Sequence, residues 1–195
     1  MLAAANERID WEAALVQRAR RGDMRAFERL YRDHIGRIYG VCLRLTRDIG
    51  QAEDCAQEAF INAWRALERF ETRSAFGTWL HRIAVNVVLA KRRRRSPIAQ
   101  APVDAAELEE AEAGFTLDTP VEVSEIEAAI GELPEGARDV LVLSGIYGHS
   151  HAEVADMLGI AEGTCKAQLH RARALLRAKL GHEGGSKERP TGIDT

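Results

Sequence analysis

The stretch from Ser150 to Leu180 constrains the fold of this chain more than any other segment. A serine that can cap a helix, a glycine at Gly159 and a second amphipathic run predict a short helix, a tight turn and a longer helix. The longer helix carries several cations and has no acidic residue between Thr164 and His182. This pattern predicts a helix-turn-helix, a motif that places its second helix in the major groove of DNA.

Two faces are predicted for that second helix. The apolar residues that would face the core are Leu169, Ala172, Leu175 and Leu176. Lys166, Gln168, Arg171 and Arg173 are left largely outward, and with His170 they are the candidates for contacts with bases and phosphates. An ordinary solvated cationic face has the same spacing, and His170 fits a surface histidine as well as a DNA contact.

The charge of the chain is divided sharply, although the net charge is only −3 over 195 residues. Residues 91–95 are Lys-Arg-Arg-Arg-Arg, whereas residues 96–124 contain Asp and Glu but no Lys or Arg. The acidic segment also holds Pro97, Pro102 and Pro120. Proline and repeated negative charge favour an extended chain, so 96–124 is predicted to be an acidic flexible linker between two domains.

Both domains are predicted to be helical, because apolar residues recur every three to four positions and no convincing strand pattern occurs. In the first domain the predicted helices cover about 9–21, 25–45 and 52–67, and a further one runs from Ser74 into the basic residues. In the second domain Pro134 opens a helix to about Ile146, ahead of the helix-turn-helix. The predicted fold is all-α, with two small helical domains of which the second contains the helix-turn-helix.

No catalytic constellation stands out. The histidines lack metal-ligand spacing, and there is no nucleophile motif or phosphate-binding loop, so we expect no enzyme, metal, cofactor or small-molecule substrate. No stretch is long and apolar enough to span a membrane, and the N-terminus lacks the apolar run of a secretory signal. Cys42, Cys55 and Cys165 lie far apart without CxxC spacing, which fits a reducing cytoplasm.

A second candidate nucleic-acid region precedes the linker. Phe70, Phe76 and Trp79 flank a polar loop near the basic residues 91–95, and aromatic side chains beside cations are typical of single-strand binding. The alternative is that Phe76 and Trp79 simply belong to the core. Asn86 is either an amide that reads a base or an interior residue whose hydrogen bonds are satisfied.

Two blocks of residues resemble the extracytoplasmic-function (ECF) class of bacterial RNA polymerase sigma factors. The first block reads AEDCAQEAFINAW over residues 52–64 and continues as FGTWLHRIAVN over residues 76–86. The second begins as LPEGARDVLVL at residues 133–143 and continues through the helix-turn-helix. Together they carry the likeness over about residues 24–95 and 125–180.

The resemblance implies a domain plan and a role. Residues 24–95 would form sigma region 2 and residues 125–181 sigma region 4. Residues 1–23 are predicted to be an N-terminal helix that packs on the first domain or leads into it, and the glycine, serine and charged residues of 182–195 predict a disordered tail. The chain would bind core RNA polymerase, recognise and melt promoters at minus-ten and minus-thirty-five elements, and initiate transcription of a stress or envelope-response regulon. The implied partners are core RNA polymerase, promoter DNA and an anti-sigma factor.

The resemblance also implies site residues. Those implied to bind the polymerase are Asp54, Gln57, Glu58 and Trp64. Those implied at the minus-ten element are Phe70, Arg73, Phe76, Trp79, Asn86, Lys91 and Arg92, and those at the minus-thirty-five element are Lys166, Gln168, His170, Arg171 and Arg173. The alternatives are a helix-turn-helix regulator that binds duplex DNA without polymerase, and a small helical enzyme or RNA-binding module.

Overall fold

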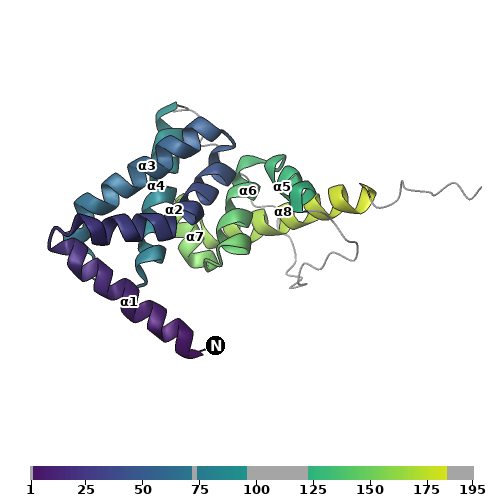
Figure 1. The fold of residues 1–195 in the computed structure, drawn as a ribbon. Coiled ribbons are helices and arrows are strands. Elements are labelled where there is room, and N and C mark those ends of the chain that lie inside the picture. The colour runs from purple at the N-terminus through teal and green to yellow at the C-terminus, as the bar shows by residue number, and fades with distance from the viewer. Residues whose placement is uncertain (1, 72–73, 96–122, 184–195) are drawn as a thin grey trace, which may run out of the picture. The chain divides into compact units, whose positions relative to one another are not determined.

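The structure is a computed structural model that describes residues 2–71, 74–95 and 123–183 (Figure 1). Every regular element in those residues is helical, as predicted. They form two compact units, one on each side of residues 96–122. Most of the predicted acidic linker therefore lies outside the described residues, as do Arg73 and residues 184–195 of the predicted tail.

Four helices and one turn build the first unit. They are α1 (Leu2–Arg20), α2 (Met24–Thr46), α3 (Ile49–Ala66), the 3-10 turn η1 (Leu67–Arg69) and α4 (Phe76–Arg95). Helix α2 packs against α1, α3 and α4, and α3 also packs against α4. The core between them is made of large apolar side chains that include Leu30, Ile38, Leu45, Leu80 and Val85.

Aspartates fix where α2 and α3 begin. The Asp23 carboxylate accepts hydrogen bonds from the backbone N–H groups of Arg25 and Ala26, and the Ala26 bond is the largest cause of the lowered pKa of this carboxyl. Asp48 accepts a bond from the Gln51 N–H at 2.7 Å. Between the two helices Arg47 adopts a left-handed conformation, with φ at 58°, and its N–H donates to the Leu43 carbonyl.

The second unit is assembled around its last helix. It consists of α5 (Val123–Gly131), α6 (Glu135–Val140), the π-helical segment η2 (Leu141–Ile146), α7 (His151–Leu158) and α8 (Glu162–Glu183). Helices α5, α6 and α7 all pack against α8. Its core includes Val140, Leu143, Val154, Leu169 and Leu176.

The helix boundaries differ from the predicted ones mainly at the ends. Helix α1 begins at Leu2 rather than near Ile9, and α8 continues to Glu183 rather than ending near Leu180. Helix α5 begins at Val123, just inside the segment predicted as linker. The predicted helix that follows Pro134 is present, but its second half has π-helical hydrogen bonding, with the Tyr147 N–H donating to the Val142 carbonyl.

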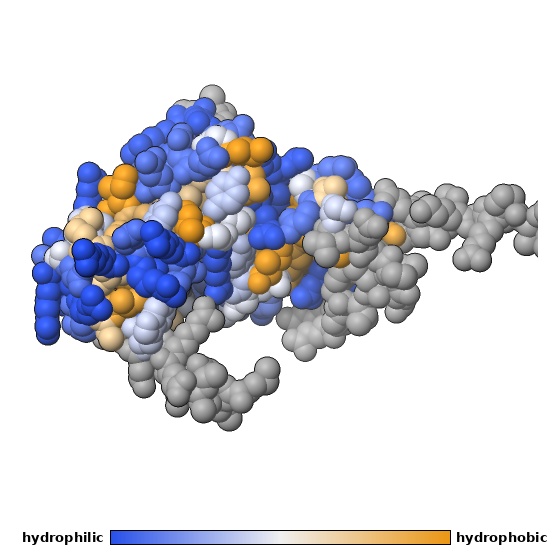
Figure 2. Space-filling view, in the orientation of Figure 1, coloured by the Kyte–Doolittle hydropathy of each residue, from blue (hydrophilic) through white to orange (hydrophobic). Residues whose placement is uncertain are grey.

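On the face shown in Figure 2 the described surface is mainly hydrophilic, with separate apolar patches. The large apolar side chains that remain exposed in the first unit are Trp11, Met24, Tyr31, Ile49 and Ile61, and those in the second unit are Ile146 and Leu175. Isolated exposed apolar residues are common, so only those that share a face with candidate site residues bear on function.

Candidate nucleic-acid interface

The predicted helix-turn-helix is present as α7, a turn at Gly159 and α8. The Ser150 hydroxyl accepts a hydrogen bond from the Glu153 N–H at 3.3 Å, and the Glu153 carboxylate accepts one from the Ser150 N–H at 3.0 Å. This reciprocal capping box starts α7. Gly159 then adopts φ of 69°, a left-handed conformation that L-residues with side chains rarely take, and its N–H donates to the Ala155 carbonyl.

One face of α8 presents cations to solvent. Lys166 and His170 are exposed and Arg173 is partly exposed, at positions separated by four and then three residues. Arg177 is exposed on the same face, one turn beyond Arg173; the sequence reasoning missed it, although the same spacing would have included it. Lys166 forms an ion pair with Glu162 at 3.6 Å, but both side chains are about half exposed, so the pair is weak.

The exposure of two residues of α8 differs from the prediction. Gln168, predicted to be outward, is only 7% exposed, and its amide lies 3.5 Å from where a Cβ on Gly136 would be. Gln168 therefore packs against the first turn of α6, which removes it from the set of groups able to reach DNA in this arrangement. Leu175, predicted to face the core, is 40% exposed. Gln168 and Leu175 are seven residues apart and lie on the same side of α8, so they differ in position along the helix and not in the face they occupy. Helix α6 covers this side at Gln168, whereas Leu175, two turns further along, remains partly uncovered.

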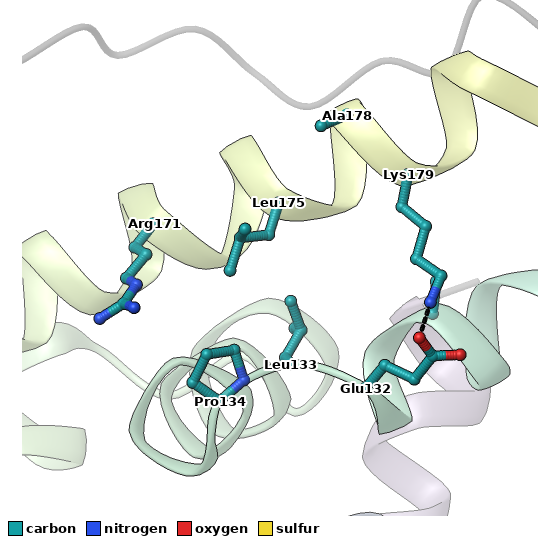
Figure 3. A pocket seen from close by; sticks show the side chains of 8 residues that line it. Glu132, Leu133, Pro134, Arg171, Leu175, Ala178 and Lys179 are labelled. Carbon is teal, nitrogen blue, oxygen red and sulfur yellow. Dashed lines mark hydrogen bonds and ion pairs between the residues drawn. The ribbon is translucent and has the colours of Figure 1, made fainter.

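Leu175 instead lines a shallow groove of about 600 Å³ between α8 and the end of α5. In Figure 3 Arg171 and Leu175 extend from α8 toward Leu133 and Pro134. At the other end of the groove Lys179 pairs with Glu132. Arg171 is exposed, but it lies on the groove side of α8 and not on the face of Lys166 and His170.

The aromatic residues of the first unit pack on one another. Phe70 and Trp79 have ring centroids 4.8 Å apart, and Phe76 lies 6.0 Å from Phe70 and 5.7 Å from Trp79. Phe70 and Phe76 are buried, so in this arrangement neither offers a ring face for base stacking. Burial of Phe76 agrees with the core alternative stated for it. Trp79 is partly exposed.

Of the two interpretations of Asn86, its exposure favours the one in which the side chain lies at the surface. It lies on α4 among buried valines, yet its own side chain is exposed, which excludes the interior hydrogen-bonding interpretation. Its amide is available to a nucleic-acid base.

The basic residues at the end of α4 differ in their contacts within the described part of the chain. Lys91 pairs with Glu58 of α3 at 3.1 Å, and Arg92 donates from Nη2 to the Leu45 carbonyl at 2.8 Å. Each of these contacts ties α4 to another helix, so Lys91 and Arg92, predicted to bind DNA, and Glu58, predicted to bind the polymerase, already have partners within the protein. The side chains of residues 93–95 are exposed; the sequence marked the basic run 91–95 as a candidate region, but only Lys91 and Arg92 of it were predicted as site residues.

A mixed polar and apolar surface lies on α3. Asp54 and Gln57 are exposed and Trp64 is partly exposed, with its ring against Phe27 of α2 at 4.8 Å. Ile61, which is 44% exposed, lies between them on the same helix face, and the sequence reasoning had not included it. Together these four residues, Asp54, Gln57, Ile61 and Trp64, form what we call the α3 face.

The three cysteine thiols are buried and poorly reactive. Burial raises the pKa of the Cys42 thiol to about 12, and it also raises the pKa values of Cys55 and Cys165. Among the described residues no three His, Cys, Asp or Glu side chains come together in a way that could hold a metal ion. None of the described helices has the length and apolar character needed to cross a bilayer.

Comparison with known proteins assigns both units. The Sigma-70 region 2 family matches residues 30–98, and the family of Sigma-70, region 4 matches residues 124–176. The chain is 38% identical to the RNA polymerase sigma-H factor of Pseudomonas aeruginosa over 85% of this chain and 92% of that protein. It is 32% identical to the ECF RNA polymerase sigma factor SigW of Bacillus subtilis over 85% of this chain and 94% of that protein.

A solved structure has the same fold. The structure of CnrH in complex with the cytosolic domain of CnrY superposes with a TM-score of 0.58 and 26% identity, and covers 89% of this chain and 99% of that chain. The matched families, the relatives and this likeness agree along nearly the whole length, and the chain belongs to the ECF RNA polymerase sigma factors.

Proposed function

We propose that this sigma factor directs core RNA polymerase to promoters with a minus-ten and a minus-thirty-five element, and that it melts the DNA at the minus-ten element. The observation that carries the proposal is α8, a helix that follows a capped helix and a glycine turn and leaves Lys166, His170 and Arg173 accessible on one face. Residues near the start of such a helix reach base edges and later arginines hold phosphates. We assign this face, with Arg177, to the minus-thirty-five element; Arg171 is a flanking contact.

The first unit supplies the other two contacts. The α3 face combines charge, amide and apolar area around a partly exposed tryptophan, which is the composition of protein-binding surfaces, and we assign it to core polymerase. On α4 the exposed Asn86 amide, the accessible part of Trp79 and the exposed arginines 93–95 are assigned to the minus-ten element. Holding an unstacked base there offsets the few kcal/mol that its extrusion costs.

The remaining assignments rest on the family. Region 2 is placed at residues 24–95 and region 4 at residues 125–181, with 96–124 as the linker, and the protein is assigned to the cytoplasm, where the polymerase acts. An anti-sigma partner is proposed because CnrH, which shares this fold, was solved bound to the cytosolic domain of a second protein. The regulon is proposed to be a stress or envelope response.

Run-off transcription with purified core polymerase tests this function. Core polymerase plus the chain is expected to give discrete transcript starts on fragments of the source genome, whereas core polymerase alone gives none. The double variant Lys166→Ala/Arg173→Ala should lose most of this output. The matched variant Arg29→Ala/Arg32→Ala removes the same charge from exposed ion pairs of α2 and should keep it. Absence of discrete starts with the unaltered chain contradicts the proposal.

A separate measurement addresses the α3 face. Asp54→Ala combined with Ile61→Ala should weaken binding to core polymerase while leaving the isolated protein folded, because both side chains are exposed. Unchanged affinity would show that the polymerase binds elsewhere.

A further inference from the structure

Helix α1 touches both ends of the connection between η1 and α4. At the η1 end, Arg20 of α1 donates from Nη2 to the Glu68 carbonyl at 3.0 Å. At the α4 end, Glu12 of α1 accepts a hydrogen bond from Nε2–H of His34 at 2.7 Å, and both side chains are largely shielded from solvent. Contacts with η1 and, through His34, with α4 thus come from one straight element.

His34 transmits the second contact to the first turn of α4. The His34 and Phe76 rings pack in an edge-on arrangement, and their centroids are 5.4 Å apart. It also lies directly on Gly77, where an added Cβ would be 2.9 Å from Cε1 of the ring. Side-chain carbons essentially never approach that closely, so the position of the ring depends on glycine at this site.

The first turn of α4 in turn holds the aromatic cluster. Phe76 packs against both Phe70 and Trp79, and Phe70 follows η1 directly. Asn86 lies further along the same helix α4. A displacement of the first turn of α4 therefore changes where Trp79 and Asn86 point, although neither residue touches α1 or His34 in any contact described above.

We propose that Glu12, His34 and Arg20 are positioning residues, which brace the connection between η1 and α4 and thereby set the geometry of the minus-ten contact. The proposal rests on the assignment of Trp79 and Asn86 to the minus-ten element, and adds that α1 controls how well this site is formed. None of the three residues is expected to touch DNA. Their effect passes through the Phe76–Trp79 packing and the orientation of α4.

The test measures binding of holoenzyme to the single-stranded non-template minus-ten segment of a promoter mapped by the run-off experiment. The contacts of Glu12, His34 and Arg20 with η1 and α4 are called the brace. Three variants disturb it: Glu12→Gln, Arg20→Gln and Gly77→Ala. Two matched variants make the same chemical change outside it. Arg21→Gln removes the neighbouring exposed charge, and Gly36→Ala adds a methyl group at a helical glycine where nothing lies within 4 Å.

Each brace variant is expected to weaken strand binding by roughly tenfold, equivalent to ~1.4 kcal/mol, with affinity for core polymerase unchanged. The double variant Glu12→Gln/Gly77→Ala should be no weaker than Gly77→Ala alone, because both changes act through the His34 ring. The matched variants should bind like the unaltered protein.

Two results overturn the proposal. One is strand binding that is unchanged in all three brace variants. The other is a loss of strand binding that is accompanied by a proportional fall in Tm and in affinity for core polymerase. General destabilisation of the protein produces that pattern. If the unaltered holoenzyme binds no minus-ten strand at all, the assignment of the minus-ten site itself fails, and this outcome is distinct from a failure of the brace alone.

Discussion

The cationic side chains at the end of α4 differ in whether they form an ion pair or a hydrogen bond with another helix. Lys91 is held by Glu58 and Arg92 by the Leu45 carbonyl, whereas the side chains of residues 93–95 extend into solvent from the same helix end. A side chain that joins two helices must give up that contact before it can neutralise a phosphate. Under the proposed assignment to the minus-ten element, the exposed arginines 93–95 supply the electrostatic part of strand binding, whereas Lys91 and Arg92 mainly join helices.

The salt dependence of strand binding checks this division. Replacing Arg93, Arg94 and Arg95 by Ala should lower the slope of log affinity against log salt by about two units, since each phosphate contact on a single strand adds ~0.7. The triple variant of Arg25, Arg29 and Arg32 to Ala, exposed residues of α2, is the control and should leave the slope unchanged. An unaltered slope in the α4 variant would assign the phosphate contacts to other residues.

A second prediction for single residues concerns the reactivity of the cysteine thiols. Because burial holds the pKa of Cys42 at about 12, above its ordinary value of 9.0, the thiol stays protonated and unreactive at pH 8. All three cysteines are buried, so alkylation by iodoacetamide should be slow in the native protein and rapid once it is unfolded. The raised pKa also means that the stabilisation from burying Cys42 is complete below pH 9.0 and is lost as the pH rises toward about 12. Rapid native labelling detected by mass spectrometry would contradict this.

Single helices show what sequence periodicity can and cannot determine. The spacing of apolar residues and the caps predicted α2, α3, α4 and the helix-turn-helix, because those signals are local to each helix. How far along α8 a given side is covered depends on the helices packed around it, and this information is not in α8 itself. Gln168 was therefore predicted to face outward, and Leu175 inward, in error.

The same limit applies to the candidate site. Exposure of Asn86 and burial of Phe70 and Phe76 depend on how α4 meets α2 and η1, contacts between residues far apart in the sequence. The Lys91–Glu58 pair joins α4 to α3 in the same way. Residue type identified the candidate groups for binding DNA or protein, but contacts between helices decide which of the described candidates are exposed.

The cap of α7 yields a prediction about the helix-turn-helix. Ser150→Ala removes the acceptor of the Glu153 N–H and half of the capping box, and should lower the free energy of unfolding by about 1 kcal/mol. Ser150→Thr keeps a hydroxyl acceptor and is the matched control, with most of the stability retained. Urea unfolding followed by circular dichroism measures both. Equal losses in the two variants would mean that the hydroxyl does not cap α7.

At the scale of the whole molecule, two units each carry a separate contact with promoter DNA, and residues 96–122 connect them. Tethering makes the second contact intramolecular, so its strength depends on the effective concentration that the connection permits. A connection that only tethers acts through its length and stiffness. A connection that binds the polymerase in a fixed position acts through its own residues. In the acidic segment 96–124 those residues are the carboxylates.

Doubling the length of segment 96–122 with Gly-Ser repeats separates these cases. For the flexible linker predicted from the sequence, effective concentration falls roughly as the −3/2 power of length, so promoter affinity should fall by about threefold. Reversing the acids to Lys at unchanged length should alter initiation if the carboxylates contact the polymerase, and should leave it unaltered if the segment is only a tether. Filter binding of holoenzyme to the mapped promoter gives the first quantity and run-off transcription the second. Complete loss of binding on lengthening would contradict the tether, because a flexible joint tolerates added residues at small cost.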